Sequence, residues 1–154
     1  MKTVLFVCTG NTCRSPMAEG LLKAALGKKS DINVASAGVA AMPGQAASRE
    51  TVAILKKKGA NLKKFQSRQL DGPMLKKVDL VIAMSSSHAD VVIQSLPNFA
   101  DRVSLLSDFI DPEEGLTGAD VPDPFGMSRA AYEEVAEVIE MAIPGIISAL
   151  EESP

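Results

Sequence analysis

The chain has 154 residues, of which 46% are hydrophobic and 23% charged, a composition that suits one globular domain with a proper core. Its net charge of −3 argues against broad binding to nucleic acid or to anionic membranes. The longest apolar-rich stretch, 136–150, contains two glutamates and a proline, so we expect no membrane-spanning helix. The apolar run after the N-terminus is too short for a signal peptide. We therefore expect a cytoplasmic protein.

Apolar runs of strand length alternate along the chain with segments of helical spacing. Ser48 is suited to cap the second helix and Gly59 to follow its end, whereas Pro144 and Gly145 should kink or interrupt the last one. The predicted strands are 2–8, 32–39, 79–84 and 102–109, and the predicted helices are 16–28, 48–59, 86–96 and 128–150.

Strands that alternate with helices predict an α/β fold, in which helices cover both faces of a parallel sheet. Ligands bind such sheets beyond the carboxyl ends of the strands, and Cys8 stands at the end of the first predicted strand. The longest segment without periodicity, 110–127, is a second candidate for function, because long loops in compact domains are often functional.

The segment between Cys8 and Pro16 has the composition of an anion-binding loop. Gly10 and Asn11 tolerate positive φ, which lets a loop turn its backbone N–H groups inward. The following helix N-terminus and the Arg14 guanidinium would add positive charge, so we expect the reactive thiolate form of Cys8 to be favoured. The spacing alone leaves a second interpretation open, in which Cys8 is only a buried core thiol.

The stretch "VLFVCTGNTCRSPMAEGLL", followed by "SAG" at 36–38, "DPFG" at 123–126 and the helix "YEEVAEVIEMAI", resembles the low-molecular-weight protein tyrosine phosphatase family. The resemblance implies one three-layer α/β/α domain over residues 1–154, with a four-stranded parallel sheet and a phosphate loop after the first strand. It also implies a hydrolase that needs no metal or other cofactor and takes phosphorylated proteins as substrates. We expect a monomer, although the residues do not decide the oligomeric state.

The resemblance assigns roles to residues of this loop. Cys8 attacks phosphorus and forms a phosphocysteine, Arg14 binds the phosphoryl oxygens, Ser15 donates a hydrogen bond to the sulfur and Asn11 maintains the loop conformation. Cys13 could form a reversible disulfide with the nucleophile. The residues expected to bind substrate are Thr9, Gly10, Asn11, Thr12, Cys13, Ser15 and Phe125.

The leaving group needs a proton, and Asp111, Asp120 and Asp123 are the candidates in the long loop. The residues themselves do not distinguish the three. The family pattern selects Asp123, because Phe125 follows it and the last helix begins soon after.

Thr12 bears on the substrate. The bacterial protein arginine phosphatases, a branch of the same family, also read "CTGNTCRS" and "DPFG", whereas the tyrosine branch usually has an aliphatic residue at this position. A small polar wall suits a guanidinium, and Phe125 would offer it a flat face. Two points count against this interpretation: Thr12 could simply cap local backbone groups, and the loop 37–48 has no aromatic residue to form the opposite wall. We therefore expect phosphoarginine as substrate, with phosphotyrosine as the alternative.

Other functions of this fold are less consistent with the residues present. The arsenate reductases of this fold need additional cysteines, and the chain has only two. A non-catalytic phosphoprotein-binding module would need no acid, so Asp123 favours turnover. His88, the single histidine, is expected on the surface near a helix start, and Arg68 is expected to support the site from below.

Overall fold

The computed structural model of the chain describes residues 2–28 and 30–152. Four strands form one sheet in the order β2-β1-β3-β4, and every neighbouring pair is parallel. The predicted four-stranded parallel sheet is therefore confirmed. The strands are β1 (Lys2–Cys8), β2 (Ile32–Gly38), β3 (Leu80–Ala83) and β4 (Val103–Leu105).

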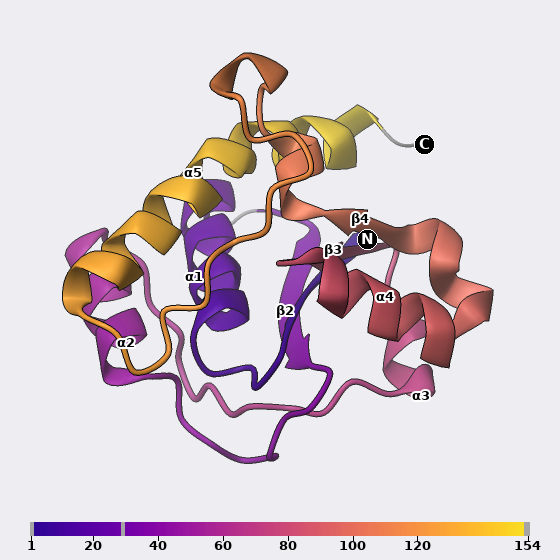
Figure 1. Cartoon of the computed structure of the whole chain (residues 1–154), viewed down its shortest axis with the longest axis horizontal. Helices are drawn as coiled ribbons and strands as arrows, with labels where there is room; N and C mark the ends of the chain where they lie inside the picture. The colour runs from indigo at the N-terminus through magenta and orange to yellow at the C-terminus, as the bar shows by residue number, and fades with distance from the viewer. Residues whose placement is uncertain (1, 29, 153–154) are drawn as a thin grey trace.

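Helices lie on both faces of this sheet, which gives the expected three layers (Figure 1). One face is covered by α1 (Arg14–Leu26), α2 (Arg49–Lys57) and α5 (Arg129–Glu152), and the other by α3 (Gly72–Leu75) and α4 (Ser86–Ser95). Short 3-10 helices follow α4 and β4 and precede the last long loop, at η1 (Pro97–Arg102), η2 (Leu106–Phe109) and η3 (Pro112–Glu114).

The position of β1 between β2 and β3 in the sheet explains why its sequence is continuously apolar. Val4 and Phe6 pack in the core on the side of α1 and α5, whereas Leu5 and Val7 pack in the core on the side of α4. All four side chains are fully buried, because successive residues of a strand point to opposite faces and both faces are covered. The buried strand therefore ends at Cys8, at the carboxyl edge of the sheet.

The caps predicted for α2 are present. The Ser48 hydroxyl accepts a hydrogen bond from the Thr51 backbone N–H at 3.2 Å, and Gly59 follows the helix with φ 74°. Both features match the requirements of helix ends, where the backbone groups lack partners within the helix.

The strand predicted at 102–109 is shorter than expected, and the interruption expected at Pro144 is absent. Only Val103–Leu105 of the strand predicted at 102–109 pairs with the sheet, because Asp108 accepts a hydrogen bond from the Leu105 backbone N–H at 2.8 Å and turns the chain into η2. Helix α5 is not interrupted at Pro144. Gly145 instead serves packing, since a Cβ there would collide with the Phe109 carbonyl.

Across the described residues, none of the helices combines the length and the apolar character needed to cross a membrane.

Candidate active site

The loop between β1 and α1 presents a row of unused hydrogen-bond donors. No backbone N–H from Thr9 to Cys13 donates a hydrogen bond to another group of the described residues. Backbone donors left unpaired inside a protein are rare, because each one costs free energy. A run of them at the start of a helix is typical of an anion-binding concavity. The anion cradle expected after the first strand is therefore present in the backbone.

Asn11 holds this loop in shape. It has φ 58° and is completely buried. Its Nδ2 donates to Ser15 Oγ at 2.8 Å and to Ser36 Oγ at 2.9 Å, and its Oδ1 accepts from the Arg68 backbone N–H at 2.9 Å. The left-handed conformation is strained for a residue with a Cβ, and these three hydrogen bonds offset that strain. Arg68 therefore supports the loop, through its backbone N–H.

The Cys8 sulfur lies 2.8 Å from Ser15 Oγ. Because Asn11 already donates a proton to that oxygen, the Ser15 hydroxyl proton remains available for Cys8. A thiolate can only accept a hydrogen bond, so this contact suits the ionised sulfur. Ser36 fixes the orientation of the Asn11 amide. Its hydroxyl donates to the Glu19 carboxylate at 2.6 Å, so the Ser36 oxygen must accept from Asn11.

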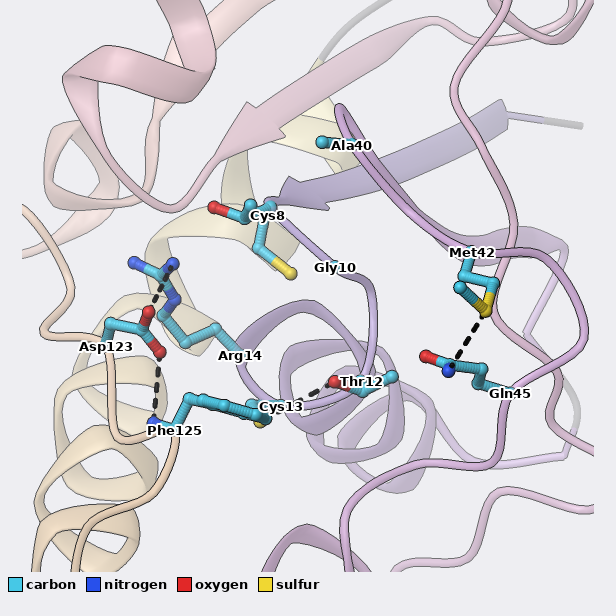
Figure 2. Close-up of a pocket in the computed structure, with 11 residues that line it drawn as sticks. Cys8, Gly10, Thr12, Cys13, Arg14, Ala40, Met42, Gln45, Asp123 and Phe125 are labelled. Atoms are coloured by element: carbon cyan, nitrogen blue, oxygen red, sulfur yellow. Dashed lines mark hydrogen bonds and ion pairs between the residues drawn. The ribbon is translucent and has the colours of Figure 1, made fainter.

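Arg14 is 7% exposed and connects the loop with the segment before α5. Its Nη1 donates to the Val121 carbonyl at 3.0 Å, and its Nη2 lies 3.7 Å from Asp123 Oδ2. The Val121 backbone N–H in turn donates to the Met84 carbonyl at the end of β3 at 2.8 Å. The guanidinium is therefore held in one orientation beside the cradle (Figure 2).

The three candidate acids have different environments. Asp111 accepts a hydrogen bond from the Glu113 backbone N–H at 3.0 Å, and Asp120 accepts one from the Ser86 N–H at 2.7 Å, at the start of α4. Asp123 accepts a similar local hydrogen bond, from the Phe125 backbone N–H at 3.1 Å, so only the position of the three carboxylates distinguishes them. Asp123 lines the same pocket as Cys8, and its side chain is 57% exposed. Of the three candidates, only Asp123, the residue that the family pattern selects, lines the pocket.

The pocket has a volume of about 330 Å³. The Cys8 sulfur lies between two walls, with Asp123 and Phe125 on one side and Met42 and Gln45 on the other (Figure 2). Phe125 lines the pocket and is 73% exposed. The lining residues are Cys8, Thr9, Gly10, Thr12, Cys13, Arg14, Ala40, Met42, Gln45, Asp123 and Phe125.

Most of the predicted site residues meet in this pocket, but Asn11 and Ser15 do not line it. Both are completely buried behind the loop, so their side chains contact the loop and the sulfur. Gln45 was missed by the sequence interpretation. Gln45 lies shortly before Ser48, whose backbone N–H donates to the Thr12 carbonyl at 2.8 Å. This contact brings the segment that contains Gln45 close to the phosphate loop, and no sequence pattern predicts it.

The expectation that His88 lies on the surface is wrong, since it is 3% exposed. Its Nε2 lies 2.8 Å from Thr9 Oγ1 and its Nδ1 lies 2.9 Å from Ser85 Oγ. Burial, followed by the positive charge of Arg14, lowers the pKa of His88 from 6.5 to about 4. The spacing offered a signal: His88 stands four residues before the buried Val92 and so shares its helix face.

Cys13 contacts the N-terminal turn of α5. Its sulfur lies 3.4 Å from the hydroxyl of the buried Tyr132, and burial together with this hydrogen bond raises the pKa of Tyr132 to about 12. Cys8 and Cys13 are both free thiols in the structure. Their reversible disulfide stays a prediction.

No group of three or more His, Cys, Asp and Glu side chains in the described part of the chain is arranged to hold a metal ion. The pocket is bordered instead by the loop with unpaired backbone N–H groups and by the Arg14 guanidinium, and such groups bind anions rather than cations.

Comparison with known proteins gives consistent results. Residues 3–153 match the model of the family described as low molecular weight phosphotyrosine protein phosphatase. A protein-arginine-phosphatase of Bacillus subtilis (strain 168) is 36% identical over 138 residues, which cover 89% of each chain.

Two solved structures are similar over nearly the whole chain. A low molecular weight protein tyrosine phosphatase from T. tengcongensis is 42% identical, with a TM-score of 0.85 and 97% and 99% of the two chains covered. The YwlE arginine phosphatase, in a cysteine-to-serine mutant with a phosphorylated active site serine, is 32% identical, with a TM-score of 0.87 and 98% and 97% covered. The chain therefore belongs to the low molecular weight phosphotyrosine protein phosphatase family, and it is a hydrolase of phosphoesters or phosphoramidates.

Proposed function

We propose that the chain is a protein phosphatase in which Cys8 is the nucleophile and Asp123 the general acid. The observation that carries this proposal is that Cys8 lines one pocket together with Arg14 and with the loop whose backbone N–H groups 9–13 are unpaired. A tetrahedral phosphoryl group offers several oxygens to these donors, and each charge-assisted hydrogen bond favours its binding.

In the first step, the Cys8 thiolate attacks phosphorus and the bond from phosphorus to the leaving atom breaks. The leaving atom takes its proton from Asp123, whose carboxyl group lines the pocket mouth. The charge that develops on the phosphoryl oxygens is stabilised by the loop N–H groups and Arg14. The Ser15 hydroxyl, 2.8 Å from the sulfur, stabilises the thiolate before attack.

In the second step, a water molecule attacks the phosphocysteine and Asp123, now a carboxylate, accepts its proton. The sulfur–phosphorus bond breaks, inorganic phosphate forms and the Cys8 thiolate is restored. The phosphorylated active site serine of the similar YwlE mutant supports a phosphoenzyme at the corresponding place.

We infer that phosphoarginine in proteins is the substrate. The Thr12 hydroxyl lines the pocket and, within the described residues, contacts only Cys13 Sγ, at 3.8 Å. It therefore caps no backbone group and is available to accept a hydrogen bond from a guanidinium. The exposed Asp123 carboxylate and the Phe125 ring offer a charge partner and a flat face. The similar protein-arginine-phosphatase of Bacillus subtilis supports this choice.

Phosphotyrosine is the second candidate, because the wall opposite Phe125 contains apolar side chains. Ala40 and Met42 line it, and an apolar wall suits a phenyl ring. The similar tyrosine phosphatase from T. tengcongensis supports this alternative.

Initial rates with a phosphoarginine protein and a phosphotyrosine protein test the two candidates. We expect faster hydrolysis of the phosphoarginine protein. Cys8→Ser should abolish turnover of both, and an active Cys8→Ser variant would contradict the proposed nucleophile.

Thr12→Ile provides the specificity test. The substitution replaces a hydroxyl with a larger aliphatic wall, so we expect kcat/KM for phosphoarginine to fall and that for phosphotyrosine to hold or rise, with a change in their ratio of about tenfold or more. Equal losses for both substrates would refute the role of Thr12 in selectivity.

A further inference from the structure

His88 connects helix α4 with the phosphate loop. It lies in the first turn of α4, and its ring spans the distance between Ser85, which precedes that helix, and Thr9, which follows β1. Thr9 lines the active-site pocket. The buried His88 side chain of α4 therefore contacts the hydroxyl of Thr9, in the loop that follows Cys8.

The direction of the hydrogen bond between His88 and Thr9 decides what Thr9 offers to a bound anion. If Nε2 carries the proton, it donates to Thr9 Oγ1 and the Thr9 hydroxyl proton stays free. If Nδ1 carries the proton, Nε2 must accept from Thr9, and only oxygen lone pairs then face the pocket. The second arrangement would place an acceptor beside the unpaired backbone N–H groups of the loop and the Arg14 guanidinium, and an acceptor there disfavours a bound phosphoryl group.

The surroundings of Ser85 allow the first arrangement. Its hydroxyl oxygen lies 3.4 Å from the His88 backbone N–H, which donates to it, and 2.9 Å from Ser87 Oγ. With protons received from these two groups, the Ser85 hydroxyl can donate its own proton to His88 Nδ1 at 2.9 Å.

We propose that His88 is a positioning residue for the phosphatase reaction, in which the neutral imidazole donates its Nε2 proton to Thr9 and leaves the Thr9 hydroxyl proton for an oxygen of the phosphoryl group. This inference rests on the proposed function of the pocket. Thr9 then acts as one more donor of the cradle, and His88 acts on substrate only through Thr9.

Two observations besides the contact itself support this role. His88 is the only hydrogen-bond partner of the Thr9 side chain in the described residues, so no other group takes the hydroxyl proton. The charged groups that interact with the ring are Arg14, which lowers the pKa of His88, and Asp120 and Asp123, which raise it. Burial outweighs both carboxylates, and the ring stays neutral at neutral pH.

The first test is spectroscopic, and the chain suits it because it contains a single histidine. Nitrogen-15 NMR of the full, untagged protein distinguishes the two tautomers directly, without phosphate and with saturating inorganic phosphate. We expect the Nε2–H tautomer with phosphate bound. The Nδ1–H tautomer in the phosphate complex would overturn the proposal.

The second test uses two amides that mimic one ring nitrogen each. His88→Gln can place an N–H where Nε2 lies and reach Thr9, whereas His88→Asn reaches only Ser85. We expect His88→Asn to lower kcat/KM for p-nitrophenyl phosphate about tenfold, the lower end of the effect of losing one hydrogen bond to a charged group, and His88→Gln to retain most of it. Equal activity of the two variants would overturn the proposal, provided both unfold at similar temperatures.

A double-mutant cycle separates positioning from general damage. Thr9→Val removes the hydroxyl at nearly constant volume, so His88→Asn should have little further effect in the Thr9→Val background, whereas additive losses would contradict action through Thr9. Phosphate affinity measured by NMR in Cys8→Ser needs no turnover. A failure of the proposed nucleophile is therefore distinguishable from a failure of this inference.

Discussion

Ser15 shows how a single hydroxyl can affect catalysis without contact with the substrate. Its oxygen lies 2.8 Å from the Cys8 sulfur and is completely buried behind the loop. Ser15→Ala should therefore lower kcat about 10- to 100-fold, the effect of losing one hydrogen bond to an ionised group, while KM stays nearly constant. Steady-state hydrolysis of p-nitrophenyl phosphate measures both constants.

Ser107→Ala is the matched control for Ser15→Ala. The Ser107 hydroxyl is also buried, but it has no hydrogen-bond partner within the described residues. Its removal should leave kcat unchanged. An unchanged kcat in Ser15→Ala would contradict a role for its hydroxyl at the sulfur.

His88 also makes stability depend on pH. Its pKa is lowered to about 4 in the folded protein and returns to about 6.5 in the unfolded chain. Between these values the unfolded state binds more protons, so stability is fully present above pH 6.5 and is lost as the pH falls toward 4. The group contributes at most about 3 kcal/mol to this loss.

The His88→Gln variant isolates this contribution, because glutamine does not titrate. Urea unfolding at pH 7 and pH 4.5 should show that the wild-type protein loses about 2 kcal/mol more than the variant over this interval. Equal losses in the two proteins would mean that His88 titrates normally in the folded state.

At the scale of elements, Gly145 controls how helix α5 packs. Replacing a glycine inside an open helix with alanine normally stabilises a protein by up to about 1 kcal/mol. A Cβ at position 145 would collide with the backbone carbonyl of Phe109 in η2, and backbone cannot yield as a side chain can. We therefore expect Gly145→Ala to destabilise the protein by about 2 kcal/mol or more.

Gly72→Ala is the control for this prediction. Gly72 begins helix α3, and the atom nearest to a Cβ added there, Leu96 Cδ2, would lie at an ordinary contact distance of 3.8 Å. Urea denaturation of both variants should show little change for Gly72→Ala and a clear loss for Gly145→Ala. A stabilised Gly145→Ala protein would contradict the packing argument.

At the scale of the whole molecule, we expect residues 1–154 to unfold as one domain. The core on the side of α5 includes residues of β1, β3, α1 and α2, so α5 cannot detach without exposing the sheet. Tyr132 is the only tyrosine of a chain without tryptophan, and its fluorescence therefore reports on α5 alone. Its unfolding midpoint should coincide with that from far-UV circular dichroism, whereas two separate midpoints would contradict a single cooperative domain.

The sequence was most informative where a residue type is required by local geometry. The apolar run of β1, the Ser48 cap and the glycine and asparagine of the phosphate loop could all be interpreted from chemistry that acts over a few residues. The end of the last strand was missed although its cause is also local, since the Asp108 carboxylate accepts a hydrogen bond from the Leu105 backbone N–H and turns the chain. The continuity of α5 through Pro144, by contrast, depends on packing that the sequence does not display.

The sequence by itself determined the alternation of strands and helices, the loop that follows Cys8 and, through its family pattern, the identity of the candidate acid. These features depend on residue type and short spacing. Only the tertiary structure decided that Asp123 rather than Asp120 lines the pocket and that His88 is buried against Thr9. The burial of His88 depends on a contact between residues more than 70 positions apart. The role of Asp120 depends on its hydrogen bond with the Ser86 backbone N–H, at the start of a helix distant in sequence.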